Sequence, residues 1–81
     1  MKVLVRLFAA ARQMTDAEAV ELELPAGATV SDVRRGLIEK YPQLSVLVPH
    51  AAFAVNSEYA DDRSELPAGA EIACIPPVSG G

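Results

Sequence analysis

The chain alternates between apolar and other side chains in two short stretches near its start. In residues 2–8, Val3, Val5 and Leu7 fall on one side. The motif VELEL at residues 20–24 alternates in the same way and places glutamates on its second face. Because a period of two residues is typical of a β-strand with one buried face, both stretches are predicted to be strands.

The middle of the chain has the wider spacing of an amphipathic helix. Thr29 is suited to cap its N-terminus, and Asp32 follows three positions later, as in a capping box. Pro42 lacks an N–H group and restricts the residue before it, so the helix is expected to end there. The apolar positions that recur at helical spacing are Val30, Val33, Leu37, Ile38 and Tyr41.

The segments between these elements have weaker patterns. Residues 9–19 are predicted to be a polar connection, and residues 61–70 a polar loop. For residues 43–51 a strand and a loop both stay open, because Pro49 interrupts an otherwise strand-like run. The motif AFAVN at residues 52–56 predicts a short strand that leads into a turn. LPAG occurs twice in the chain and is interpreted as the same turn used at two places.

A last strand is predicted in EIACIP, which runs directly into two prolines. Ile72 and Cys74 are expected to point inward, whereas Ala73 and Ile75 point outward. Two strands, a helix and further strands in this order predict an α+β domain, in which a curled sheet packs against one main helix.

Composition narrows the class of protein. At 81 residues the chain has room for one hydrophobic core, and 51% hydrophobic residues are too many for a disordered segment. Only 5% of the residues are aromatic, so the core is expected to be aliphatic. The net charge of −4 disfavours nucleic-acid binding, because phosphates would repel the surface. No stretch approaches the roughly 20 apolar residues of a membrane span, and the cytoplasm is the expected compartment.

Candidate catalytic groups are few. The sequence has no phosphate-binding loop, no CxxC pair, no HExxH and no GxSxG. His50 is expected to be an exposed bystander, and Asp61 and Asp62 to be solvated in a turn. Cys74, the single cysteine, is expected to be a small buried hydrophobic group rather than a reactive thiol. We therefore expect no turnover by this chain alone, and no metal site.

The segment IPPVSGG at residues 75–81 offers a different kind of chemistry. Pro76 and Pro77 favour an extended exit from the domain, which we place at residues 1–76. In the tail, residues 77–81, Gly80 and Gly81 lack a Cβ and fit a narrow slot that any side chain would block. The carboxylate of Gly81 would be unhindered, and adenylation would give it a leaving group. A frayed end is the alternative, but a strand that runs directly into this tail favours function.

Three segments carry a resemblance to a known family. ATVSDVRRGLIEKYP, AFAVN and above all LPAGAEIACIPPVSGG resemble the small subunits of molybdopterin synthase, which are ubiquitin-like β-grasp sulfur carriers. The similarity covers nearly the whole chain, including the opening VLVRLFAAARQ. In the family, larger apolar residues, often aromatic, stand where this chain has Cys74 and Ile75.

The resemblance implies a mechanism at Gly81. A ubiquitin-activating-type enzyme would use ATP to adenylate the carboxylate, and a sulfur donor would displace AMP to leave a thiocarboxylate. Val78, Ser79 and the two glycines would then enter the large synthase subunit. There the sulfur would pass to a cyclic pyranopterin phosphate and build the dithiolene that holds molybdenum. The catalytic groups would belong to the partner, and this chain would bind no cofactor tightly.

The resemblance also implies a docking surface. In a β-grasp sheet the first and last strands are neighbours, so the outward residues Leu4, Phe8 and Ile75 are predicted to form one apolar patch near the root of the tail. Arg12, which matches the opening segment of the family, is predicted to add a polar contact with a partner.

Three alternatives stay open from the sequence. A carrier for thiamine thiazole or cysteine biosynthesis would share the fold and the diglycine. A protein modifier would be joined through Gly81 to lysines of its targets. A plain binding module would have an inert tail, and deletion of Gly81 would leave it unaffected.

Overall fold

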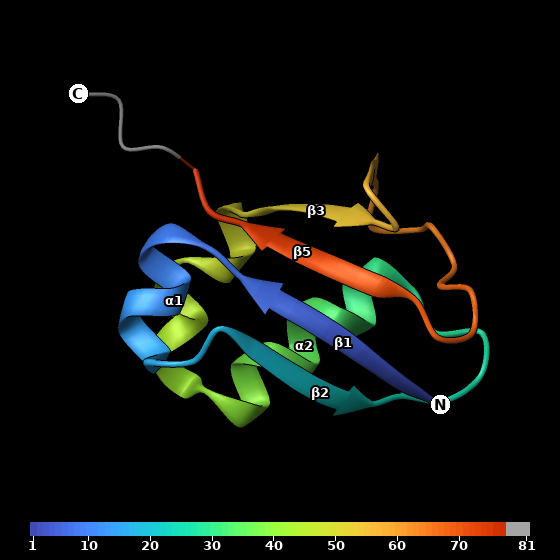
Figure 1. Ribbon diagram of the computed structural model, residues 1–81, viewed down its shortest axis with the longest axis horizontal. Coiled ribbons are helices and arrows are strands. Elements are labelled where there is room, and N and C mark those ends of the chain that lie inside the picture. The colour runs from blue at the N-terminus through green and yellow to red at the C-terminus, as the bar shows by residue number, and fades with distance from the viewer. Residues whose placement is uncertain (78–81) are drawn as a thin grey trace.

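The computed structural model describes residues 1–77, which form one sheet with helices gathered on one side of it (Figure 1). The strand order is β2-β1-β5-β3-β4, and β1 and β5 are parallel whereas the other neighbours are antiparallel. This arrangement confirms the predicted α+β class. The elements are β1 (Lys2–Leu7), α1 (Ala9–Thr15), β2 (Ala19–Glu23), α2 (Val30–Lys40), the 3₁₀ helices η1 (Pro42–Val46) and η2 (Val48–His50), β3 (Ala52–Val55), β4 (Glu58–Ala60) and β5 (Glu71–Ile75).

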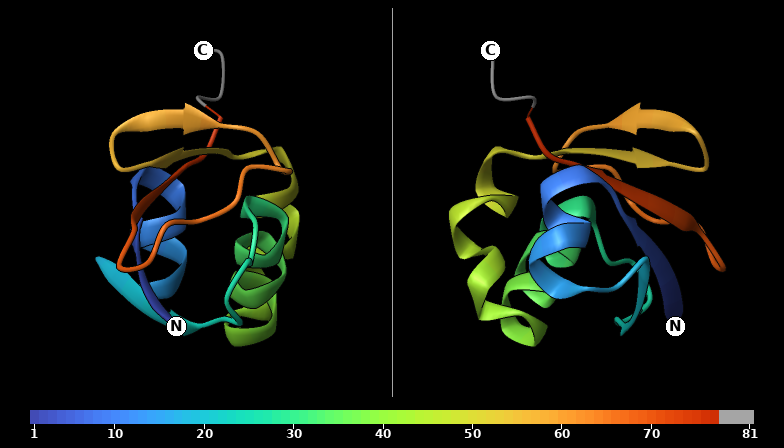
Figure 2. Two further views of the ribbon diagram at one scale, coloured as in Figure 1. Left: turned by 90° about the vertical axis from the view of Figure 1, so that its right-hand side faces the viewer. Right: turned by 60° about the vertical axis from the view of Figure 1, so that its left-hand side comes forward.

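The core lies between the sheet and the helices (Figure 2). The predicted alternation is confirmed, since the inward side chains of β1, β2 and β5 are buried and their neighbours are more exposed. Among residues 1–77, Phe53 is the only aromatic side chain that is fully buried, so the predicted aliphatic core is also confirmed. The other large side chains that are fully buried in the core are Leu37, Leu44, Ile72, Val3, Val5, Val30, Val33, Val48 and Cys74.

Helix α2 begins and ends where the sequence predicts. The carboxylate of Asp32 accepts a hydrogen bond from the backbone N–H of Thr29 at 2.8 Å, which satisfies a donor at the helix start. The helix stops at Lys40, two residues before Pro42. Gly36 lies against β2, where a Cβ would stand 3.1 Å from a methyl group of Leu22. The glycine therefore lets the helix approach the sheet closely.

Three segments differ from the predictions or resolve them. The stretch predicted to be a polar connection contains helix α1, formed by residues of high helix propensity such as alanine, arginine, glutamine and methionine. The ambiguous residues 43–51 form most of η1 and η2 rather than a strand. Strand β4 was not predicted, because it has only three residues, two of them exposed.

The two LPAG motifs do form the same turn. In each, an alanine N–H donates to the proline carbonyl three residues earlier, at 3.1 Å for Ala28 and 3.2 Å for Ala70. Gly27 and Gly69 have φ angles of +84° and +71°, a region that glycine adopts without a steric penalty. Within residues 1–77 no helix is long and apolar enough to cross a membrane.

Candidate functional site

The parallel pairing of β1 with β5 brings two distant segments together at one end of the sheet. Leu7 pairs with Cys74, so the next residues, Phe8 and Ile75, follow side by side on the opposite face of the sheet from α2. Phe8 has an extended backbone, with φ −121° and ψ 157°, and therefore continues the alternation of β1 before α1 begins. Its side chain is 45% exposed.

A shallow apolar hollow of about 440 Å³ opens at this place. All its lining residues lie on that one face of the sheet. Phe8, Ala73 and Ile75 form one wall, and three residues of the β3–β4 hairpin form the other. These three are Ala54, Ser57 and Tyr59. Tyr59 is 77% exposed and pairs with Ala54 across the hairpin.

The lining of the hollow suits docking rather than catalysis. Apart from the hydroxyl groups of Ser57 and Tyr59, its side chains are hydrocarbon, and they include no carboxylate, imidazole or thiol. Contiguous apolar side chains on a surface, with aromatic rings among them, are typical of sites where a partner protein inserts a side chain. The hollow can therefore bind an apolar group of a partner.

Tyr59 is a member of this surface that the sequence analysis missed. The available signal was the pair Asn56-Ser57, whose φ angles of +48° and +73° form the tight turn of the hairpin. A strand after such a turn would place Tyr59 beside Ala54, on the same face as Ile75. That strand was not predicted, because the segment around Tyr59 is short and polar.

The other two residues predicted for the docking surface lie elsewhere. Leu4 pairs with Glu71 at the start of β5 and does not line the hollow. Arg6 stands between Leu4 and Phe8 on the same face, and its Nε lies 3.3 Å from a carboxylate oxygen of Glu71. The charged pair thus separates Leu4 from the hollow.

Arg12, the predicted polar contact, projects from α1 into solvent. Its Nη2 donates to Oε1 of Glu18 at 2.5 Å, and both side chains are largely exposed. The pair links α1 to the residue before β2, and neither side chain lines the hollow.

The root of the tail leaves the sheet directly beside the hollow. Ile75 is the last residue of β5 and lines the hollow; Pro76 is buried and Pro77 is exposed. Strand β5 thus ends beside the hollow, and the described part of the chain ends two residues later (Figure 1). Val78, Ser79, Gly80 and Gly81, on which the predicted chemistry depends, lie outside the described residues.

The remaining candidate groups are placed as follows. Cys74 is buried, and burial raises the pKa of its thiol to about 11, while the nearby positive charge of Arg34 acts in the opposite direction. His50 is exposed at the end of η2. Asp61 and Asp62 are exposed and engaged in a turn and an ion pair. Within residues 1–77 no group of three or more histidine, cysteine or acidic side chains is arranged to hold a metal ion.

Comparisons with known proteins give a consistent picture. The ThiS family matches residues 5–81 of this chain. The molybdopterin synthase sulfur carrier subunit of Caenorhabditis briggsae is 41% identical, over 100% of this chain and 99% of the relative. In the crystal structure of SAMP1 from Haloferax volcanii, a small archaeal modifier protein, a chain 30% identical superimposes with a TM-score of 0.88 over the full length of both chains.

The ubiquitin of Caldiarchaeum subterraneum is similar in fold, with a TM-score of 0.69 at 20% identity over 100% of this chain and 98% of that one. At this identity the likeness concerns the fold alone. Together with the sheet order and the helix packing, it confirms the predicted ubiquitin-like β-grasp fold.

Proposed function

Because the chain belongs to the ThiS family, we propose that it is a sulfur carrier in molybdenum cofactor biosynthesis and acts as the small subunit of molybdopterin synthase. One observation carries the proposal: the likeness to a named sulfur carrier subunit extends over the whole chain, and the family match runs through the diglycine to Gly81. The expected place of action is the cytoplasm.

The chemistry is assigned to the carboxylate of Gly81. A free carboxylate is a poor electrophile, so a ubiquitin-activating-type enzyme joins it to AMP and releases pyrophosphate from ATP. A sulfur donor then attacks the acyl carbon, AMP leaves, and a thiocarboxylate remains on Gly81. Gly80 and Gly81 have no side chain that would obstruct the passage of the tail into a narrow site.

The hollow supplies the second part of the proposal, which is recognition of the large subunit. Ile75 belongs both to the hollow and to the last strand before the tail. A partner that fills the hollow between Phe8 and Tyr59 therefore holds the chain six residues from its reactive end. Six residues beyond Ile75 span at most about 22 Å, so the catalytic site of the partner lies within that distance of the hollow. The large subunit provides the catalytic groups that transfer the sulfur to the pyranopterin.

The proposal is tested by the mass of the intact chain after incubation with its adenylating enzyme, ATP and a sulfur donor. Replacement of one oxygen by one sulfur is the expected change, and it should disappear when Gly81 is deleted. A chain that is adenylated by the enzyme but does not exchange an oxygen for a sulfur would contradict the proposal.

A second candidate function is protein modification, favoured by the likeness to SAMP1 at a TM-score of 0.88 and 30% identity. In that case the carboxyl group of Gly81 forms an isopeptide bond with a lysine of a target protein, and the product contains no thiocarboxylate. The two functions give different products. A sulfur carrier is found as a free chain with a C-terminal thiocarboxylate, whereas a modifier is found in a larger conjugate, joined to its target through the diglycine.

A further inference from the structure

The outer wall of the hollow belongs to a hairpin that is attached to the sheet along one side. Within residues 1–77, strand β4 lies at the edge of the sheet and has β3 as its one neighbouring strand. Ser57 and Tyr59 belong to this outer part of the hairpin, whereas Phe8 and Ile75 belong to the opposite wall. The width of the hollow therefore depends on how the base of the hairpin is held.

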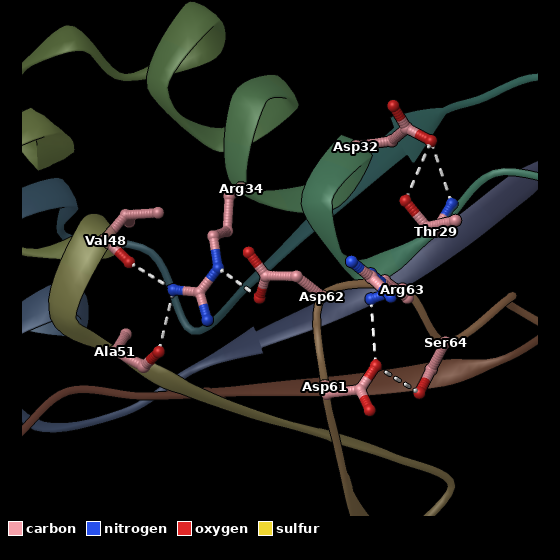
Figure 3. Close-up of polar contacts among 9 residues, drawn as sticks. All are labelled: Thr29, Asp32, Arg34, Val48, Ala51, Asp61, Asp62, Arg63 and Ser64. Carbon is pink, nitrogen blue, oxygen red and sulfur yellow. Dashed lines mark hydrogen bonds and ion pairs between the residues drawn. The ribbon is translucent and has the colours of Figure 1, made fainter.

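Arg34 of α2 holds both ends of that base (Figure 3). Its Nη1 donates to the carbonyl oxygen of Ala51 at 2.8 Å, and Ala51 is the residue before β3. The same nitrogen donates to the carbonyl oxygen of Val48 at 2.7 Å. Its Nε donates to Oδ1 of Asp62 at 2.9 Å, and Asp62 is the second residue after β4. One guanidinium group thus joins the start and the end of the hairpin to the main helix.

The guanidinium group is itself fixed. Its central carbon lies 4.7 Å from the centre of the ring of Phe53, the second residue of β3, and the side chain of Arg34 is 21% exposed. A planar guanidinium that donates several hydrogen bonds fixes both the distance and the direction of its partners, whereas a lysine ammonium fixes only their distance. The side chain of Arg34 is therefore held in one position, unlike a charged side chain that extends freely into solvent.

The loop that carries Asp62 is ordered by its own contacts. Oδ1 of Asp61 accepts the backbone N–H of Arg63 at 2.9 Å and the hydroxyl of Ser64 at 3.3 Å. The carbonyl oxygen of Asp62 accepts the N–H of Ser31 at 3.1 Å, at the start of α2. These bonds position the carboxylate of Asp62 beside Arg34, and none of them uses that carboxylate itself.

We propose that the Arg34–Asp62 pair is a positioning clamp, which sets the place of Tyr59 relative to Phe8 and thereby the affinity of the hollow for the large subunit. The inference rests on the proposed function, because it assigns the hollow to that partner. Neither Arg34 nor Asp62 lines the hollow. Both act through the hairpin, and the residues that pair β3 with β5 include neither of them.

The test compares Asp62→Ala with Asp62→Asn, which keeps an oxygen that can accept from Nε of Arg34. Glu39→Ala is the matched control, since it removes one exposed carboxylate from α2 without touching the hairpin. Affinity for the purified large subunit is measured by calorimetry, and backbone proton–nitrogen correlation spectra are recorded on each free variant. The spectra also show that each variant is folded.

We expect Asp62→Ala to weaken binding about fivefold and to shift the amide signals of Ser57 and Tyr59. Asp62→Asn should restore both the signals and the affinity to within about twofold of the wild type. Glu39→Ala should change neither. Arg34→Lys, which keeps the charge but cannot bridge both ends of the hairpin, should move the same signals as Asp62→Ala.

Equal affinities for Asp62→Ala and the wild type would overturn the clamp. So would an Asp62→Asn variant as weak as Asp62→Ala, because the charge would then act on the partner directly. If the wild type itself does not bind the large subunit, the proposed function fails. The spectra still decide on the clamp in that case, and unmoved signals of Ser57 and Tyr59 in Asp62→Ala and Arg34→Lys count against it.

Discussion

At the scale of single residues, Cys74 shows how position decides chemistry. It is the one thiol of the chain, and it lies three residues before the tail to which the sulfur chemistry is assigned. Its side chain points into the core, however, and burial raises its pKa to about 11. The residue is therefore a core member, and the sulfur of the proposed reaction is a separate atom brought to Gly81.

The thiol of Cys74 should accordingly be inert in the folded chain. At pH 8 a pKa of about 11 leaves roughly one thiolate per thousand molecules, so alkylation should be at least about a hundredfold slower than in denaturant. Iodoacetamide labelling followed by mass spectrometry measures both rates. The rate in the native chain should rise as the pH approaches 11, and equal native and denatured rates at pH 8 would contradict the burial.

Ser57 makes a second prediction at this scale. Its φ of +73° is unfavourable for a residue with a Cβ, and glycine adopts it freely. Ser57→Gly should therefore raise the free energy of unfolding by about 0.5–1 kcal/mol, as measured by urea denaturation. Ser45→Gly, at an exposed position in η1 whose φ is not positive, should lower it. A loss of stability in both variants would show that no strain is stored at the turn.

At the scale of elements, the N-terminus of α2 depends on one carboxylate. The N–H of Thr29 donates to Asp32, and this bond together with the hydroxyl of Thr29 and the charge of Arg35 lowers the pKa of Asp32 below its ordinary value of 3.8. Because the folded-state pKa is the lower one, the unfolded chain binds more protons in this range. The stabilisation from Asp32 is complete above the unfolded value and is lost as the pH falls through the folded value.

Asp32→Asn should therefore be less stable than the wild type at pH 7, and the difference should shrink as the pH falls from about 5 to about 3. Urea denaturation at a series of pH values measures it. Glu39→Gln, near the other end of α2, serves as the control and should follow the wild type. Parallel stability curves for Asp32→Asn and the wild type would contradict the capping role.

The elements also show what can be predicted from sequence. Strands β1, β2 and β5 and helix α2 were predicted because each buries one face, which leaves a clear period in the sequence. Helix α1 buries only Ala11, so no apolar period marks it and only its propensity could have indicated it. Strand β4 has no buried residue, and its existence depends on pairing with β3.

At the scale of the whole molecule, the site combines what was predictable with what was not. Phe8 and Ile75 were predicted to be neighbours from the pairing of the first and last strands, and the structure places both in the hollow. Tyr59 was missed, because it reaches the hollow only through the β3–β4 pairing and the turn at Ser57. Leu4 was included because its position in β1 also faces outward. The ion pair of the intervening Arg6 with Glu71 depends on the pairing of β1 with β5, and alternation alone does not predict it.

The docking role of the hollow gives a prediction of its own. Phe8→Asp should lower the affinity for the purified large subunit at least about tenfold, because a carboxylate would replace an apolar contact in the hollow. Val46→Asp is the control: Val46 is 72% exposed, but it lies on η1 and does not line the hollow. Calorimetric titration of both variants measures the effect, and equal binding by the two would remove the hollow from the interface.

In the proposed function, this small domain docks through the hollow and gives up a sulfur atom from Gly81. The most direct measurement starts from the chain prepared with a C-terminal thiocarboxylate and follows its intact mass in the presence of the large subunit and the pyranopterin precursor. We predict that the mass returns to that of the carboxylate form, with sulfur appearing in the pterin, only when both are present. A thiocarboxylate that persists in the complete mixture, with a large subunit shown to be active, would contradict the account.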